Sequence, residues 1–154
     1  MTIEIVRGDL LDALDRGEIH WAVHCVNGQG KFGPVLAAQI KKRYPKVFEE
    51  YLVALEGFKQ DGWPILGQWQ PVRLSRTKGV INLFGQEFYG TDKRYINYGA
   101  IGSCFYQMRN HYDKETILGF PFKFAANNGG GDWNTILEMI EYYFKDHSVK
   151  IYKL

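Results

Sequence analysis

The sequence has few cysteines and prolines, no large excess of charge and no long apolar run. Its 154 residues include only two cysteines and five prolines, and 19 basic residues nearly balance 17 acidic ones. The resulting charge of +2 is no strong electrostatic footprint for duplex nucleic acid. The N-terminal stretch MTIEIVRGD lacks the apolar core of a signal peptide, and no apolar run approaches the length of a membrane span. We therefore expect a cytoplasmic protein, without membrane partners, that forms a single domain over residues 1–154.

The two cysteines and the four histidines show no pattern that would bind a metal. Cys25 and Cys104 lie in separate apolar runs, without CxxC spacing and without a histidine cluster. Buried free thiols are expected, rather than a disulfide or a zinc site. No carboxylates or histidines have ligand spacing, so the residues require neither a metal nor a cofactor. Aromatic residues make up 16% of the chain; most are expected in the core, and a surface that stacks on a base is the alternative.

The apolar pattern alternates between strands and helices along the chain. Strands are predicted at residues 3–6, 19–26, 68–74, 80–84, 117–124 and 149–152, and helices at residues 10–14, 35–43, 46–56, 97–108 and 133–144. Residues 19–26 are almost continuously apolar, as in a strand that is buried on both faces. This order predicts an α/β protein with a mixed, largely parallel sheet between two layers of helices.

The most informative stretch is the strand, loop and helix at residues 21–43. The loop at residues 27–33 (NGQGKFG) is rich in glycine, and Pro34 opens the helix that follows. Glycines let the backbone come close to a ligand, and the unpaired amides at the start of a helix point at an anion. The stretch therefore predicts a site for a negatively charged ligand.

Two further loops are expected beside this one. Ligands of such sheets bind outside the carboxyl ends of the strands, where residues 27–33, 85–94 and 125–132 are predicted to lie. The first and third loops are glycine-rich and precede helices, which favours a diphosphate held from both sides. The motif G-x-G-x-x-G does occur at residues 28–33, but it follows the second strand, and no acidic residue ends a strand about 20 residues later. A dinucleotide site of the Rossmann type is therefore a poor fit.

The ordered combination of motifs resembles the macro domain, an ADP-ribose-binding fold. The motifs are Asp9 after the first strand, Val26-Asn27 with its glycine-rich loop, INLFGQ-x-x-YG at residues 81–90, and the FPFK…GGDW run at residues 120–133. The chain is similar over nearly its whole length to the branch with bacterial and phage macro domains and yeast-type ADP-ribose-1″-phosphate phosphatases. The resemblance implies a three-layer α/β/α macro domain fold. It also implies ADP-ribose or an ADP-ribose ester as the ligand, and an ADP-ribosylated macromolecule as a further partner.

The resemblance assigns a ligand contact to each matching residue. Asp9 would accept a hydrogen bond from the adenine amino group, with Leu10 beside it, and Asn27 would hold the distal ribose. The diphosphate would be contacted from one side by Gly30, Gly33, Pro34 and Val35, and from the other by Asn127, Asn128 and Gly129. Phe84 and Gly85 would line the adenine or proximal-ribose side. The structural alternatives are a helix N-cap for Asp9, a loop-forming role for Asn27, and a core position for Phe84.

His24, Asn27 and Asp132 are the predicted catalytic residues. His24 lies three residues before Asn27, and histidine titrates in the range that suits acid or base catalysis. Asp132, in GGDW, is expected where a carboxylate could activate water. A hydrogen-bonded core histidine and an N-cap of the following helix are the respective alternatives.

Two departures from the family pattern bear on the chemistry. Pro34 and Val35 are bulkier than the residues usual at the first loop. The lysine of the human-type de-ADP-ribosylases, which would fall near Gln86 or Glu87, is not retained.

We expect hydrolysis of ADP-ribose-1″-phosphate to ADP-ribose and phosphate. De-ADP-ribosylation of protein or nucleic acid, and non-catalytic binding of ADP-ribose, are the alternatives.

Overall fold

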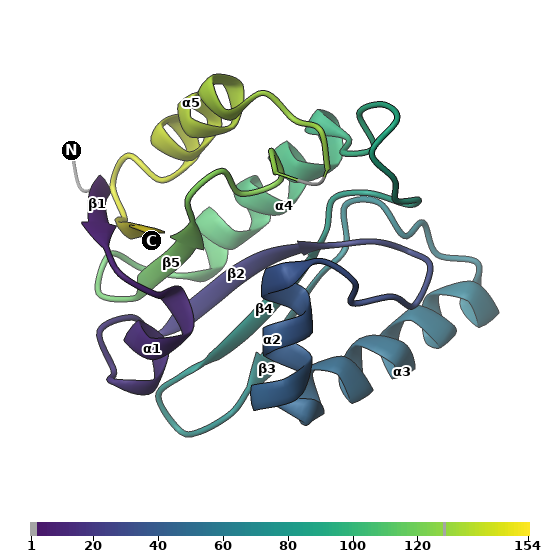
Figure 1. Cartoon of the computed structure of the whole chain (residues 1–154), viewed down its shortest axis with the longest axis horizontal. Helices are drawn as coiled ribbons and strands as arrows, with labels where there is room; N and C mark the ends of the chain where they lie inside the picture. The colour runs from purple at the N-terminus through teal and green to yellow at the C-terminus, as the bar shows by residue number, and fades with distance from the viewer. Residues whose placement is uncertain (1–2, 128) are drawn as a thin grey trace.

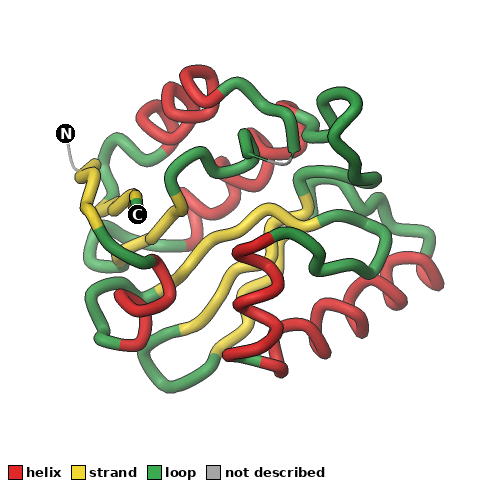
Figure 2. Tube along the Cα trace, in the orientation of Figure 1, coloured by secondary structure: helices red, strands yellow, loops and turns green. Residues whose placement is uncertain are grey.

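The computed structural model of the chain describes residues 3–127 and 129–154. Strands and helices alternate along most of the chain, as the sequence predicts (Figures 1 and 2). In order they are β1 (Ile3–Arg7), α1 (Leu10–Asp15), β2 (Trp21–Val26), α2 (Val35–Arg43), α3 (Pro45–Asp61), β3 (Trp69–Arg73), β4 (Gly79–Phe84), α4 (Tyr98–His111), β5 (Ile117–Pro121), α5 (Trp133–Tyr143) and β6 (Ser148–Lys153).

The strands form one sheet in the order β1-β6-β5-β2-β4-β3. All neighbouring strands pair in parallel except β3, which is antiparallel to β4 at the edge of the sheet. The mixed, largely parallel sheet predicted from the sequence is therefore confirmed. Pro71 lies exposed in the edge strand β3, a position where proline is tolerated because its missing N–H breaks no internal pairing.

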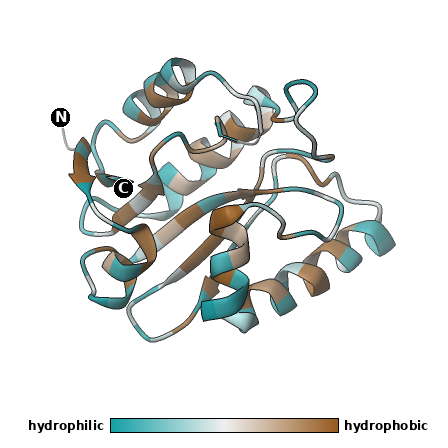
Figure 3. Ribbon diagram, viewed as in Figure 1, coloured by the Kyte–Doolittle hydropathy of each residue, from teal (hydrophilic) through white to brown (hydrophobic). Residues whose placement is uncertain are grey.

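Helices cover both faces of the sheet. Helices α4 and α5 pack on one face and α1, α2 and α3 on the other, so the fold has three layers (Figure 1). Side chains of β2 alternate between the layers: Trp21 and Val23 face α4 and α5, whereas Ala22 and Val26 face the opposite helices. In Figure 3, hydrophobic residues follow the central strands, and the helices alternate between hydrophobic and hydrophilic residues. The predicted α/β/α architecture is confirmed.

Several predicted boundaries are wrong, and helix α4, for example, ends at His111 rather than at residue 108. Helix α3 continues past Gly57 to Asp61 and ends at Gly62, which has a left-handed backbone (φ 70°). The helix continues because the ring of Phe58 packs on the buried ring of Phe84, with 5.4 Å between ring centroids. Strand β5 ends at Pro121 rather than at residue 124, because Lys123 and Ala125 adopt positive φ angles of 61° and 60° that a strand excludes.

None of the helices within residues 3–127 and 129–154 combines the length and apolar character needed to cross a membrane.

Candidate functional site

The candidate site lies at the carboxyl ends of β2, β4 and β5. Because β2 and β4 are parallel and their last residues, Val26 and Phe84, pair with each other, the loops that follow leave the sheet at the same edge. The loop after β5 leaves in the same direction, since β5 also runs parallel to β2. The three loops expected to form the site are thus neighbours, and Figure 1 shows them together on one side of the sheet.

Asn27 shapes the loop that it opens. The residue is only 7% exposed. Its Nδ2 donates to the carbonyl of Lys31 at 2.8 Å, and its Oδ1 accepts from the amide of Gln29 at 2.9 Å. These bonds close a turn around the side chain, as expected for an asparagine in a loop. The loop-forming alternative is confirmed, and the predicted ribose contact stays a proposal.

Tyr51, on α3, holds the same loop from inside the protein. Its fully buried hydroxyl accepts from the amide of Gly30 at 3.0 Å and lies 2.7 Å from the carbonyl oxygen of Asn27, to which it donates. Burial raises the pKa of Tyr51 to about 12, so the hydroxyl keeps its proton near neutral pH. The amide of Gly30, predicted to face a diphosphate, therefore points to Tyr51 instead. The left-handed φ of 77° at Gly30 explains why glycine is needed there.

The start of α2 is exposed next to this loop. Gly33, Pro34 and Val35 are exposed, with Val35 at 74%. Pro34 is the N-cap and has no side-chain hydrogen bond to the helix, and the first turn contains no acidic residue. The orphan amides of the first turn therefore stay open to an anion.

The second loop is bonded to the first. The amide of Gly28 donates to the carbonyl of Glu87 at 2.9 Å, and Nε2 of Gln29 donates to the same oxygen at 3.2 Å. Gly85 is buried, and a Cβ at this position would lie 2.7 Å from the Cys25 sulfur. The ring of Phe84 is fully buried and stacks on Tyr51, with 5.6 Å between centroids. The structure thus places the Phe84 side chain in the core, which corrects its predicted contact with the ligand.

The third loop is bonded to the second. The carbonyl oxygen of Gly129 accepts from the amides of Tyr95 at 2.9 Å and Ile96 at 3.2 Å. A Cβ on Gly129 would lie 2.3 Å from a methyl carbon of Ile96, so this close approach requires glycine. Asn127 is exposed, and Asn128, also predicted to contact the diphosphate, lies outside the described residues. The three loops therefore form one connected rim.

Asp9 caps α1. Its Oδ1 accepts from the amides of Leu11 and Asp12, both at 2.9 Å, and Arg43 lies 3.9 Å from the same oxygen. The N-cap alternative is confirmed, although a cap formed by Oδ1 leaves Oδ2 as a second acceptor. The Leu10 side chain is buried in the core at 5% exposure, so only its backbone is placed to contact a ligand.

His24 lies beneath the rim, between the sheet and α3. It is 3% exposed, and its Nε2 lies 2.6 Å from Oδ1 of Asn82. Burial lowers the pKa of His24 to about 4, so the ring is neutral at pH 7 and Nε2 donates to Asn82. Phe32 covers the ring edge-on at 5.1 Å between centroids. This geometry matches the alternative of a hydrogen-bonded core histidine.

Asp132 is exposed at the end of the third loop. Its Oδ2 accepts from the amide of Thr135 at 2.9 Å and from the Thr135 hydroxyl at 2.8 Å, which caps α5. These hydrogen bonds lower the pKa of Asp132 and favour its charged form. Its own amide donates to the hydroxyl of Tyr98 at 2.8 Å. The N-cap alternative is confirmed, and the carboxylate is a charged group at the rim.

Comparison with known proteins identifies the fold. The sequence matches no protein-family model and no curated protein. A protein of unknown function from Bacteroides thetaiotaomicron matches with a TM-score of 0.83 and 22% identity, over 100% of this chain and 99% of that chain. The macrodomain of Mycobacterium tuberculosis DarG matches with a TM-score of 0.74 and 24% identity, over 99% and 97% of the two chains. This chain has the macrodomain fold. Thermosipho africanus DarTG, in complex with ADP-ribose, matches with a TM-score of 0.73 and 17% identity, over 97% of this chain and 41% of that chain.

The fold brings the predicted site residues together only in part. Gly33, Pro34 and Val35 lie exposed beside the first loop, and Gly129 lies in the joined rim. In contrast, the side chains of His24 and Phe84 lie in the core. Within the described residues, no group of three or more histidines, cysteines or carboxylates could hold a metal. Cys25 and Cys104 are free, as predicted, and burial raises the pKa of both thiols to about 12.

Sequence reasoning missed two tyrosines that support the rim formed by the three loops. Tyr51 fixes the first loop and Tyr98 fixes the end of the third, each through its hydroxyl. Both side chains fit the apolar spacing of their helices, so the pattern predicts only that they pack. A buried tyrosine hydroxyl needs a hydrogen-bond partner. This requirement is the one signal in the sequence that could have indicated a contact between Tyr51 and a loop.

Proposed function

We propose that this macrodomain binds ADP-ribose at the rim formed by its three loops. One observation carries the proposal: the hydrogen bonds from Gly28 to Glu87 and from Tyr95 to Gly129 join these loops at the carboxyl ends of parallel strands. Ligands of such sheets bind at this edge. The complex of Thermosipho africanus DarTG with ADP-ribose supports the choice of ligand.

Each part of the nucleotide has a matching group in the proposed site. The open amides at the start of α2, beside Gly33, would bind the diphosphate, whose charge the helix start favours. Asn127, Asn128 and Gly129 would cover it from the other side. Because the cap of α1 uses Oδ1 of Asp9, Oδ2 would accept from the adenine amino group. Asn27 would reach the distal ribose at the mouth of the first loop.

We further propose that the site hydrolyses an ADP-ribose ester, with ADP-ribose-1″-phosphate as the leading substrate. The charged carboxylate of Asp132 would take a proton from a water that attacks the phosphorus, and Asn27 would orient the ribose. The ester P–O bond would break, and the released ribose oxygen would take a proton from solvent. His24 is neutral at pH 7 and bonded to Asn82. Its single N–H is used by Asn82, so His24 would support the strand beneath the first loop rather than act as an acid.

Non-catalytic binding of ADP-ribose is the second candidate function, and one observation favours it. All three predicted catalytic side chains form hydrogen bonds within the protein: His24 with Asn82, Asn27 with its own loop, and the exposed Asp132 with Thr135. A site that only binds the nucleotide needs no free acid or base.

Calorimetric titration with ADP-ribose tests the binding site. Asp9→Asn keeps an oxygen for the cap of α1 but replaces the second acceptor with a donor. We expect about 10- to 150-fold weaker binding, the usual range for a lost hydrogen bond to a charged group. Asp12→Asn, one turn into the same helix and exposed, is the matched control and should bind as the wild type does. If the wild type fails to bind ADP-ribose, the proposed site is wrong.

Product assays separate the three activities. Phosphate released from ADP-ribose-1″-phosphate by the wild type, but not by Asp132→Asn, would establish the proposed hydrolysis. Release of ADP-ribose from modified protein or nucleic acid, with the free ester left intact, would establish de-ADP-ribosylation instead. Tight binding of ADP-ribose without turnover of any of these substrates would establish non-catalytic binding.

A further inference from the structure

Gln86 is a buried polar residue with no role in the binding and hydrolysis proposed above. It lies two residues after the end of β4 and is 9% exposed. Its Nε2 donates to the carbonyl of Phe88 at 2.9 Å. Only the nitrogen of an amide side chain can donate, so this bond fixes the orientation of the amide and turns Oε1 away from Phe88. Oε1 is therefore an acceptor with a defined direction.

The oxygen Oε1 of Gln86 faces the first and third loops. The thiol of Cys25, in the strand that leads into the first loop, lies 4.0 Å from it. A Cβ on Gly129, in the third loop, would lie 3.1 Å from it. A thiol is a weak donor, and among the described residues no stronger donor is bonded to Oε1. A buried amide oxygen usually has a hydrogen-bond partner, which a hydroxyl group of a ligand would supply.

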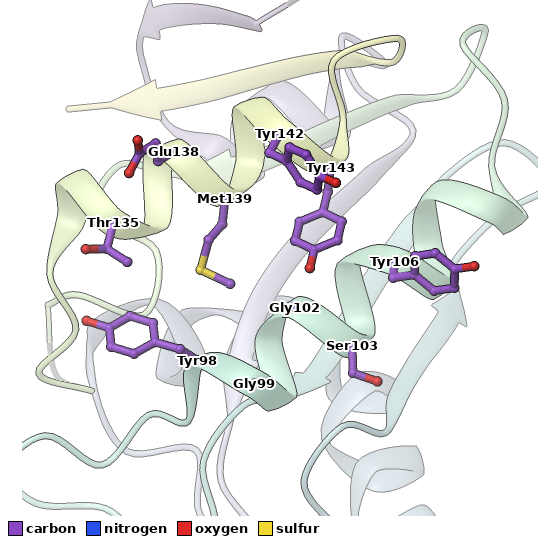
Figure 4. Close-up of a pocket in the computed structure, with 10 residues that line it drawn as sticks. All are labelled: Tyr98, Gly99, Gly102, Ser103, Tyr106, Thr135, Glu138, Met139, Tyr142 and Tyr143. Atoms are coloured by element: carbon purple, nitrogen blue, oxygen red, sulfur yellow. The ribbon is translucent and has the colours of Figure 1, made fainter.

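The third loop is held in place beside Gln86. At its end, the hydroxyl of Tyr98 accepts from the amide of Asp132, and Thr135 donates twice to the Asp132 carboxylate. Figure 4 shows Tyr98 on α4 and Thr135 on α5, on the two sides of the groove between these helices. The carbonyl of Gly129 bonds the loop to the second loop. These bonds fix Gly129 next to Oε1 before a ligand arrives.

The strand order determines which end of ADP-ribose Gln86 can meet. Asp9, the proposed adenine contact, follows β1, whereas Gln86 follows β4. Strands β6, β5 and β2 lie between them, which places the ends of β1 and β4 roughly 19 Å apart, at about 4.8 Å per strand. Gln86 therefore lies at the end of the site away from adenine, next to the loop that Asn27 opens.

The hydrogen-bonding groups of the nucleotide lead to the same end. Ionised phosphate oxygens only accept hydrogen bonds, so a carbonyl oxygen cannot bind the diphosphate. The donors of ADP-ribose are its adenine amino group and its ribose hydroxyls. The amino group and the proximal ribose belong to the Asp9 end of the site. A hydroxyl of the distal ribose is the donor that remains for Oε1 of Gln86.

We propose that Oε1 of Gln86 accepts a hydrogen bond from the 2″- or 3″-hydroxyl of the distal ribose. This contact rests on the proposed binding of ADP-ribose at the rim. It would let the site select nucleotides that carry a distal ribose over ADP, which has only phosphate oxygens at this place. A site built to bond a hydroxyl rejects an analogue without it, because a polar group of the site is then left unpaired.

Calorimetric titration with ADP-ribose and with ADP tests this contact. The measured quantity is the Kd for ADP divided by the Kd for ADP-ribose. Gln86→Met keeps the length of the side chain without its amide, so this ratio should fall about 2- to 13-fold, the range for one neutral hydrogen bond. Gln86→Glu loses the donor to Phe88 but keeps an acceptor oxygen, so its ratio should not fall.

Two further measurements serve as controls. Gln60→Met makes the same substitution at an exposed position near the end of α3, and it should leave the ratio unchanged. The wild type itself provides a test without any substitution. In the isotope-labelled protein, the nuclear magnetic resonance signals of the Gln86 side-chain amide should shift more with ADP-ribose than with ADP.

Four results would overturn the proposal while the ADP-ribose site stands. They are a wild type that binds ADP-ribose no more tightly than ADP, an unchanged ratio in Gln86→Met, an equal fall of the ratio in Gln86→Glu, and amide signals of Gln86 that respond alike to both nucleotides. Equal weakening of both ligands in Gln86→Met would identify a residue that only shapes the loops. In contrast, a wild type that binds no ADP-ribose would overturn the proposed site and this contact together.

Discussion

The hydroxyl of Tyr51 holds Gly30 in place: it accepts a hydrogen bond from the Gly30 amide at 3.0 Å, across 21 residues of sequence. The same hydroxyl donates to the carbonyl of Asn27. One buried oxygen on α3 therefore fixes both the beginning and the middle of the glycine-rich loop. The shape of the loop depends on a residue outside the loop.

Replacing Tyr51 with phenylalanine tests this relationship. The ring and its packing remain, while the Gly30 amide and the Asn27 carbonyl lose their partner. We expect a loss of about 1–3 kcal/mol in the free energy of unfolding, because buried polar groups are left unsatisfied. ADP-ribose binding should also weaken. Urea denaturation and calorimetry measure the two effects, and Tyr106→Phe, at an exposed position, is the control. Unchanged stability and affinity in Tyr51→Phe would contradict the assigned role.

Alanine at two glycines should have opposite effects on stability. In Gly129→Ala the new methyl would lie 2.3 Å from a carbon of Ile96 and 2.9 Å from the carbonyl of Ala125. Such overpacking typically costs about 1–3 kcal/mol. Gly57 lies inside α3 with nothing within 4 Å of a new methyl, so Gly57→Ala should stabilise by about 0.5–1 kcal/mol. Thermal unfolding of both variants checks the signs. A stable Gly129→Ala would show that the second and third loops are not packed as described.

His24 should make the fold sensitive to acid. Its pKa of about 4 in the folded protein lies below the ordinary value of 6.5. The unfolded chain therefore takes up this proton first as the pH falls. The contribution of His24 to stability is complete above pH 6.5 and is lost as the pH falls toward 4, by up to about 1.4 kcal/mol per pH unit.

Urea denaturation across this pH range measures the effect. His24→Gln, which has no ionisable group, should lose less stability between pH 6.5 and 4 than the wild type. The imidazole resonances of His24 provide a direct check, because their titration near pH 6.5 would contradict a buried, neutral ring.

Two substitutions of Asp132 separate its roles. Asparagine is as good an N-cap as aspartate, whereas alanine at an N-cap costs about 0.5–2 kcal/mol. Asp132→Ala should therefore lower the free energy of unfolding by about that amount, and Asp132→Asn should leave it nearly unchanged. If Asp132 activates water, both variants lose phosphate release. Hydrolysis retained in Asp132→Asn would leave the residue with its capping role alone.

The sequence predicts the layers well because they follow from local patterns. The continuous apolar run at residues 19–26 marks a central strand, and the strand–helix alternation then implies a parallel sheet. The glycines near Gly30 and Gly129 mark the loops, since each position requires a positive φ or a close approach. These signals act over a few residues and need no knowledge of distant contacts.

The state of each site residue depends on contacts that no local pattern records. His24 is neutral because it is buried against Phe32 and bonded to Asn82, a residue 58 positions away. For Asp9 and Asp132, capping and ligand binding use the same residue type at the same place, so sequence alone leaves both roles open. Helix α3 passes Gly57 because Phe58 packs on Phe84, which outweighs the low helix propensity of glycine.

Pro71, in the edge strand β3, has a consequence for association between chains. An exposed sheet edge is a template on which a strand of another molecule can pair and start aggregation. Proline supplies no N–H at the middle of β3, so a foreign strand cannot form an unbroken ladder there. Replacing Pro71 with valine would remove this protection, and we infer that this one residue helps to keep the protein monodisperse at high concentration.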